Sequence, residues 1–557
     1  MDVFRFRFFS NSIVVDCGVC IWEKYICLKR RILCFGENLA FPEWTEVQDY
    51  EREAIQFLRL NELRDSINEV LFPYLITITP YFRVVSWLTW IFSRLEEEMG
   101  GAAVMTAREY VDRQLRYYGV LATADILYSR ELGTYHRGPI GVEGLANKLG
   151  LLSSDVVDFN HPSFGKPLDP VSIYRSSLVA MELLEEKQQP ISAGRFQSIL
   201  LPTESGKELA KAFEANWSGL VNPNKLATKM KWEISLLKKL GKLIDLQGLS
   251  PREKESKLLQ NAARSSMKYP KFYDDFVDTV VATIKTLDKA GYKASSSDIS
   301  KAALYRSAIT PEEKEVTLSL EDTEATALLA YHELHTHMSF GADAILNGLV
   351  NLARDSFTGV SKQNIYKKTS EALNLKIIEQ RGSVEVLYGK IGKSFRHYLG
   401  KYRTGSPPPF GKLGFESLRE KTRDSEDNFE KIANGVIILL QSAVCQGFFK
   451  PNWLIRILPF HRKVFSAYTI LEEYESLPPN APIENWVKSA IDLVVQKHDD
   501  VASRKGLYAR RLENREDMLF YRADAEFDEQ RGRLANAVLW LSDIGVIGVD
   551  QGLFTMR

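Results

Sequence analysis

This sequence has few cysteines, no long apolar run and no excess of charge of either sign. Only five of the 557 residues are cysteine, and a small, odd number excludes the disulfide framework of small secreted proteins. No apolar run reaches the ~18 residues that a membrane-spanning helix needs, because Pro73, Pro80 and Arg83 interrupt the most apolar region, residues 67–92. Lys+Arg and Asp+Glu both number 72, so the net charge indicates no partner. We therefore expect a cytoplasmic protein without a membrane span.

The common nucleotide-binding and nucleophile motifs are also missing. The sequence contains no G-x-x-x-x-G-K-[ST] phosphate loop, no G-x-G-x-x-G after an expected strand and no G-x-S-x-G turn. We therefore predict no catalytic residue and no cofactor. Whether the protein is an enzyme stays open, with a non-enzyme favoured.

Three of the eight histidines, His332, His335 and His337, lie within six residues. On a helix, His332 and His335 share a face, so a metal could draw on two ring nitrogens and on the more distant carboxylate of Glu333. The spacing differs from the H-E-x-x-H helix of zinc proteases, whose histidines are four apart. One hypothesis is a metal-dependent nuclease that uses this cluster. The favoured interpretation is three partly buried or surface histidines, each satisfied by one hydrogen bond.

The length of the chain predicts three or four domains, because one compact core cannot hold 557 residues. We expect an N-terminal extension over residues 1–44, a helical domain over 45–223, a basic segment with a central helical domain over 224–400, and a C-terminal helical domain over 401–557. The last boundary falls at K-Y-R-T-G-S-P-P-P-F-G, whose prolines and glycines forbid a helix.

Four of the five cysteines, Cys17, Cys20, Cys27 and Cys34, lie in the N-terminal extension. Four thiolates can surround zinc tetrahedrally, but only Cys17 and Cys20 form a close pair. Alternating apolar residues around them also suit a hairpin, in which cysteine is a small apolar filler. Whether residues 1–40 are ordered or bind zinc stays open.

The pattern as a whole predicts a mainly α, multidomain helical protein with winged-helix-like elements and short β-hairpins. In I-L-L-P-T-E-S-G-K-E-L-A-K-A-F, residues 199–213, an apolar strand runs into Pro202 and Thr203 is placed to cap a helix. That helix should turn Leu209, Ala210 and Phe213 inward. Such a strand, turn and helix are typical of the closing segment of a winged-helix domain.

A second element of this kind is expected at the C-terminus. There a helix over residues 533–543 is followed by Gly545, which suits the left-handed turn that closes a helix. A short hairpin over residues 546–555 then ends the chain.

Trp87 and Trp90 lie three residues apart on a helix expected over residues 84–95. Aromatic side chains at helical spacing favour the core, because they bury large areas. The alternative is an architectural adaptor, in which these tryptophans and the proline-rich stretch dock other subunits.

The strongest charge asymmetry lies in residues 225–271, which hold twelve Lys or Arg against four acids. We expect a helix over residues 232–244 that projects several cations on one side and apolar residues on another. Such cations can meet the phosphates of a nucleic acid, without sequence specificity. The predicted phosphate contacts are Lys229, Lys231, Lys238, Lys239 and Lys242, flanked by Lys207, Lys211 and Arg195. The alternative is a solvated face balanced by acids elsewhere in the fold.

The chain resembles a loosely defined family of uncharacterised bacterial proteins encoded in antiphage defence islands. The resemblance rests on FPEW at residues 41–44, on residues 71–90 and 201–213, and on residues 545–555. It implies a cytoplasmic subunit of a defence complex that acts beside a nuclease or ATPase, and it supplies no catalytic residue. We therefore predict a non-catalytic subunit that binds nucleic acid, DNA in particular, or serves as a scaffold.

Overall fold

The residues that the computed structural model describes all lie within one compact unit of the chain, residues 57–557. The described residues are 58, 60–75, 81–100, 106–132, 149, 155–159, 170–192, 195–248, 252–267, 269–309, 315–379, 415–445, 458, 465–477, 481–505, 510–525, 533–550 and 553–556. The predicted N-terminal extension with its four cysteines and the proline-rich stretch at residues 401–411 lie outside them. No helix in this described part combines the length and the apolar character needed to span a membrane.

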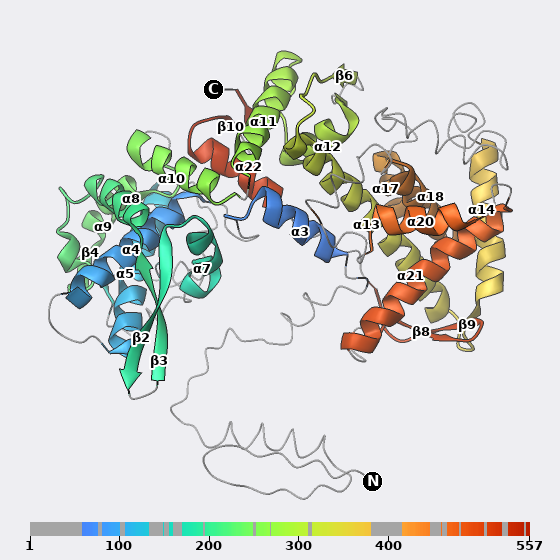
Figure 1. The fold of residues 1–557 in the computed structure, drawn as a ribbon, viewed down its shortest axis with the longest axis horizontal. Coiled ribbons are helices and arrows are strands. Elements are labelled where there is room, and N and C mark those ends of the chain that lie inside the picture. Colours follow the sequence, from blue (N-terminus) through green and yellow to red (C-terminus); the bar gives the residue numbers. More distant parts are fainter. Residues whose placement is uncertain are drawn as a thin grey trace, which may run out of the picture. The chain divides into compact units, whose positions relative to one another are not determined.

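The described part is mainly helical with a few short antiparallel strand pairs, as predicted (Figure 1). Its first group of elements, in chain order, centres on helices α4 and α5, except for α3, which packs against helix α13 (Glu324–Arg354). The group comprises α3 (Asn61–Leu71), α4 (Arg83–Gly100), α5 (Ala107–Glu131), β1 (Val156–Asp158), α7 (Pro170–Ala180), β2 (Leu184–Ser192), β3 (Arg195–Pro202), α8 (Glu204–Ala215), the 3₁₀ turn Pro223–Lys225, β4 (Lys231–Glu233) and α9 (Ile234–Ile244).

A second group combines helices from the middle of the chain with its C-terminal segment. It comprises α10 (Glu253–Ser265), α11 (Lys271–Lys289), α12 (Ser296–Tyr305), β5 (Ser307–Ile309), β6 (Glu315–Thr317), α22 (Arg533–Asp543), β10 (Gly548–Asp550) and β11 (Leu553–Thr555). Ala294, which precedes α12, pairs with Phe554 of β11 in an antiparallel bridge. The last strand of the chain is thus tied to residues 260 positions earlier.

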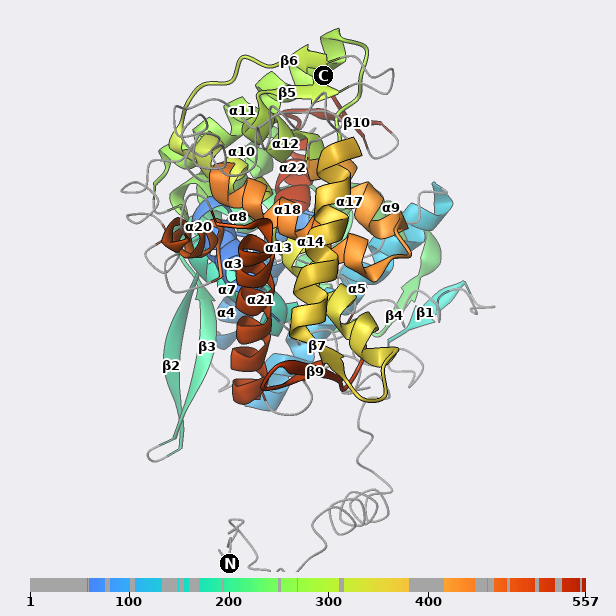
Figure 2. The same cartoon turned by 90° about the vertical axis from the view of Figure 1, so that its right-hand side faces the viewer.

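A third group surrounds the long helix α13, which packs along α18 (Figure 2). It comprises α13 (Glu324–Arg354), β7 (Val360–Ser361), α14 (Lys362–Glu379), α17 (Phe415–Asp424), α18 (Asn428–Cys445), α20 (Ala467–Ser476), α21 (Ile483–Lys505), β8 (Leu512–Arg515) and β9 (Met518–Tyr521). The predicted domain boundaries at 223/224 and 400/401 stay predictions, and packed pairs such as α5 with α9 and α13 with α18 span them.

The local signals that predicted the segment around Thr203 are confirmed. Strands β2 and β3 form an antiparallel ribbon that projects from the neighbouring helices, and β3 ends at Pro202 (Figure 1). The Thr203 hydroxyl accepts the backbone N–H of Gly206 at 3.1 Å, which caps α8. Leu209, Ala210 and Phe213 of α8 are buried, as expected for the inward face.

The local features expected at the C-terminus, a helix end, a glycine turn and a hairpin, are also present. Helix α22 ends at Asp543, and Gly545 has a φ of 82°, the left-handed conformation that glycine adopts without steric cost. Strands β10 and β11 then pair antiparallel with Val549 opposite Phe554. The end of α22, the turn at Gly545 and the β10–β11 hairpin therefore follow one another directly in this segment.

The two tryptophans of α4 belong to the core, as the favoured interpretation predicted. Trp87 and Trp90 are 0% and 1% exposed. The Trp87 indole N–H donates to the carbonyl of Ile244 at 3.2 Å, and that of Trp90 donates to Glu214 at 2.6 Å. Because both side chains are enclosed, neither is a docking residue for another subunit.

Candidate nucleic-acid interface

The basic segment folds as a strand followed by a helix, which differs from the single helix expected over residues 232–244. Strand β4 pairs with β1, with Trp232 opposite Val157, and the N–H of Ile234 donates to the carbonyl of Asp155 at 2.9 Å. Helix α9 therefore begins at Ile234, and Lys231 lies on the strand. The prediction was wrong here because the partner strand, some 75 residues earlier in the sequence, competes with helix propensity for this backbone.

A close approach to α5 fixes the side of α9 that faces solvent. Leu237, Leu240 and Ile244 are buried, while Ile234 stays partly exposed. Gly241 lies so close to α5 that a Cβ atom there would come within 2.1 Å of the Ala124 carbonyl oxygen. A glycine at this position lets the two helices pack backbone to backbone, and it turns the lysines of α9 outward.

Two side chains of α4 and one from the residue before α10 hold the carboxyl end of α9. Arg83 Nη1 donates to the carbonyl of Asp245 at 2.7 Å, and Arg252 Nη2 donates to that of Leu243 at 2.7 Å. The Trp87 indole contacts the Ile244 carbonyl. Cations and N–H donors at a helix C-terminus complement its partial negative charge. These buried and partly buried hydrogen bonds therefore hold the end of α9 in place.

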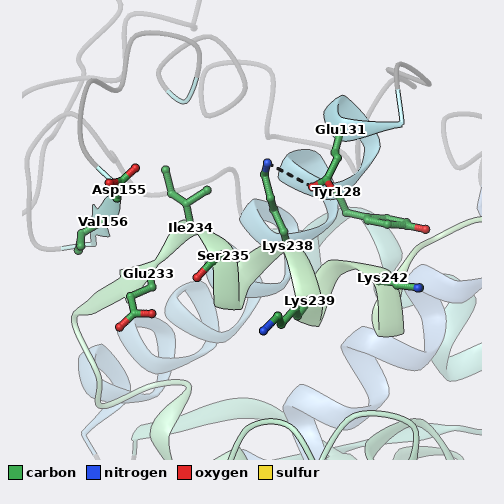
Figure 3. A pocket seen from close by; sticks show the side chains of 10 residues that line it. All are labelled: Tyr128, Glu131, Asp155, Val156, Glu233, Ile234, Ser235, Lys238, Lys239 and Lys242. Carbon is green, nitrogen blue, oxygen red and sulfur yellow. Dashed lines mark ion pairs between the residues drawn. The ribbon is translucent and has the colours of Figure 1, made fainter.

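A pocket of ≈ 700 Å³ lies beside the exposed side of α9 (Figure 3). Its lining comes from the last turn of α5, from β1 with the residue before it, from the last residue of β4 and from α9 along most of its length. The lining residues are Tyr128, Glu131, Asp155, Val156, Glu233, Ile234, Ser235, Lys238, Lys239 and Lys242. Three of the five lysines predicted to contact phosphate thus share one pocket.

The cations of this surface differ in how far their charge is compensated. Lys238 Nζ lies 3.2 Å from Glu131 Oε2, and Lys231 Nζ lies 3.8 Å from Asp158 Oδ2. Lys239 and Lys242 are exposed and form no ion pair with any residue that the structure describes. They are the two pocket cations best placed to attract an anion.

The other predicted contacts lie outside the pocket lining. Lys229 is exposed, with its ammonium 4.7 Å from the centre of the Trp232 ring. Lys207 hydrogen-bonds Glu96 at 3.3 Å and also faces Glu204, and these carboxylates raise its pKa. Lys211 is exposed on α8. Arg195 begins β3, and its side chain is outside the described part.

The histidine cluster on α13 forms three separate environments. His335 Nε2 hydrogen-bonds the Leu60 carbonyl at 2.6 Å, and His337 Nε2 hydrogen-bonds the Tyr305 hydroxyl at 3.1 Å. Neither ring nitrogen of His332 has a hydrogen-bond partner among the residues that the structure describes. His335 and His337 therefore each have a hydrogen-bond partner, as expected, but all three rings are buried, and the prediction of partly buried or surface histidines was wrong.

Burial keeps the rings of this cluster neutral. It lowers the pKa of His332 to about 3 and that of His335 to about 4, and it lowers the pKa of His337 well below its usual range. Among the residues that the structure describes, no three His, Cys, Asp or Glu side chains are grouped so that they could hold a metal ion. The geometry gives the metal-dependent nuclease hypothesis no support.

Sequence reasoning missed the acidic and aromatic half of the pocket. Tyr128, Glu131 and Asp155 lie about a hundred residues before α9, in segments without a charge cluster of their own. Only the packing of α5 and β1 against α9 and β4 brings them together. The cations were recognisable because they are adjacent in sequence.

No family model matches the chain, and neither the curated proteins nor the solved structures include a match. The chemistry of the site is therefore the ground for a functional proposal.

Proposed function

We propose that the protein is a non-catalytic nucleic-acid-binding subunit whose α9 lysines contact the phosphate backbone. The observation that supports this proposal is the pocket itself, where Lys238, Lys239 and Lys242 gather and two of them lack a carboxylate partner among the described residues. The lining also holds three carboxylates, so the attraction for a polyanion is assigned to the exposed Lys239 and Lys242, which form no ion pair with a described residue. The resemblance to defence-island proteins extends the proposal to a cytoplasmic subunit of a bacterial antiphage complex, beside a nuclease or ATPase.

We expect the lysines to act as point charges that contact phosphates and not to recognise individual bases. Ammonium groups neutralise phosphates and release counterions, so affinity should fall steeply with salt. Such contacts position a nucleic acid without reading its sequence. The subunit would then hold the nucleic acid for a partner that performs the chemistry.

The order of elements in the C-terminal segment supports a winged-helix-like module. In this module the helix that would contact DNA is covered. Helices α11 and α12, the Ala294–Phe554 bridge, α22 and the β10–β11 hairpin follow the order of such a module. Trp540 of α22 is 2% exposed and stacks on Phe82 at 3.9 Å between ring centres. Because α22 is covered, the module serves as a structural junction, and binding is assigned to α9.

The N-terminal ribbon also supports a winged-helix-like element. Helix α7 precedes the β2–β3 ribbon, and α8 follows it. The exposed Arg175 of α7 is paired with Glu186 of β2, and Lys187 is paired with Glu185 at 2.7 Å. Arg175 and Lys187 are thus compensated, in contrast to Lys239 and Lys242.

Charge reversal tests the proposal. The double variant Lys239→Glu/Lys242→Glu should weaken retention of DNA and RNA at low salt at least tenfold, because repulsion replaces two phosphate contacts. Fluorescence anisotropy against a salt series measures the effect. The matched control is Lys254→Glu/Lys257→Glu, which makes the same charge change at the same spacing on two exposed lysines of α10. Equal losses in both double variants, or no loss in either, would contradict the proposal.

A further inference from the structure

Tyr128 gives the lysine pocket an aromatic wall. It lies in the last turn of α5 and lines the pocket together with Lys238 and Lys242 of α9 (Figure 3). Its side chain is partly exposed, its ring contacts no other aromatic ring, and its hydroxyl has no hydrogen-bond partner among the described residues. The nearby Tyr117 and Tyr118, by contrast, are fully buried. Tyr128 thus combines an accessible ring with a rigid helical position.

Carboxylates occupy the opposite part of the same pocket. Asp155 and Glu233 are exposed and form no ion pair with a described residue, while Glu131 is engaged by Lys238. A duplex laid across this opening would bring its phosphates against these acids as well as against the lysines. A carboxylate can, however, accept a hydrogen bond from the exocyclic amino group of a base.

We propose that this pocket receives an unpaired nucleotide of a single-stranded nucleic acid, an inference that rests on the proposed function of the same lysines. The base stacks on Tyr128, and the phosphates on either side contact Lys239 and Lys242. On the opposite side of the pocket, Asp155 and Glu233 face the amino groups of an adjacent unpaired base (Figure 3). Cationic grooves with aromatic platforms are the general means of binding single strands.

The shape of the pocket supports a single strand over a duplex. Paired and stacked bases present no free face, and a stiff duplex cannot bend into a recess, whereas an unpaired base can be splayed out into one. The volume of ≈ 700 Å³ lies within the range of ordinary small-ligand pockets, about 300–1,000 Å³. A nucleotide therefore fits where a helix does not.

Substitution of Tyr128 tests the inference. Tyr128→Leu keeps apolar bulk but removes the flat ring, and it should weaken binding of single strands roughly 5- to 150-fold, the range for one lost base–aromatic stack. Tyr128→Phe should bind like the wild type. Neither change should alter the binding of a duplex. The measurement is fluorescence anisotropy with labelled single strands, DNA in one arm and RNA in the other, and with the matching duplex.

Base composition provides a second readout. Thymine lacks an exocyclic amino group, so oligo(dC) should bind more tightly than oligo(dT), and Asp155→Asn/Glu233→Gln should reduce the difference. Equal binding of single strand and duplex, with an unchanged Tyr128→Leu variant, would overturn this inference and leave the proposed function standing. If the wild type binds neither single strands nor duplex at low salt, both are overturned.

Discussion

Arg83 and Glu255 form a fully buried ion pair between helices α4 and α10. Arg83 Nε lies 3.1 Å from Glu255 Oε1, and Arg83 Nη2 lies 3.2 Å from Oε2. Asn216 adds a hydrogen bond to Glu255 at 2.8 Å, and the remaining Arg83 donors bind the carbonyls of Asp245 and Leu243 at the end of α9. The same guanidinium thus balances a buried charge and anchors the helix that carries the lysine pocket.

Removing one partner of this pair should be costly. Glu255→Gln leaves the Arg83 charge buried without an anion, and we expect a loss of about 3–5 kcal/mol in the free energy of unfolding. Urea denaturation measures the loss. The control is Arg264→Met, which breaks the exposed pair with Asp274 and should cost at most about 1 kcal/mol. Similar losses in the two variants would contradict the importance assigned to the buried pair.

Gly241→Ala should disturb both stability and binding. The added methyl group would lie 2.1 Å from the Ala124 carbonyl oxygen and 2.7 Å from the Tyr128 Cβ, so α9 must move away from α5. We expect a loss of about 1–3 kcal/mol, the usual range for overpacking, and weaker binding of single strands because the two walls of the pocket separate. Thermal unfolding and anisotropy measure the two effects.

The control for this prediction is Gly219→Ala. Gly219 is exposed, and a Cβ there would meet no atom within 4 Å. That variant should unfold and bind like the wild type. If Gly241→Ala also behaves like the wild type, the close contact between α5 and α9 does not set the geometry of the pocket.

The sequence revealed features whose signal lies within a few residues. The cap at Thr203, the turn at Gly545 and the burial of Trp87 follow from local chemistry, and each is confirmed. The mainly helical class follows from the same periodicities. These predictions needed no knowledge of which elements become neighbours.

The features that were missed depend on distant partners. Arg83 and Glu255 are 172 residues apart, and nothing in either local sequence marks them as a pair. Glu131 and Lys238 meet only because α5 packs on α9. Residue periodicity describes one element at a time, so the acidic and aromatic half of the pocket emerged from the packing alone.

Asp125 makes the stability of the α5–α9 region depend on pH. It is 3% exposed, and burial raises its pKa to about 7, although its Oδ1 accepts the N–H of Leu246 at 3.1 Å. Between pH 4 and 7 the folded state holds a proton that the unfolded state has lost. The stability that the neutral Asp125 carboxyl contributes is therefore fully present below pH 4 and is lost as the pH rises through 7. Asp125→Asn keeps an acceptor for Leu246 and removes the ionisation, so it should stabilise the protein more at pH 8 than at pH 5.

His332 should make stability depend on pH in the opposite direction. Burial lowers its pKa to about 3 from the 6.5 of a free histidine, so the unfolded state binds the extra proton between these values. Stability is then lost as the pH falls below 6.5, and His332→Phe should stabilise the protein more at pH 5 than at pH 8. Thermal unfolding of the wild type and the two variants at both pH values measures the change in stability that each substitution causes at each pH. Equal shifts at pH 5 and pH 8 in the Asp125→Asn variant would show that this carboxyl ionises alike in the folded and unfolded states, because only a pKa difference between the two states makes the effect of the substitution depend on pH.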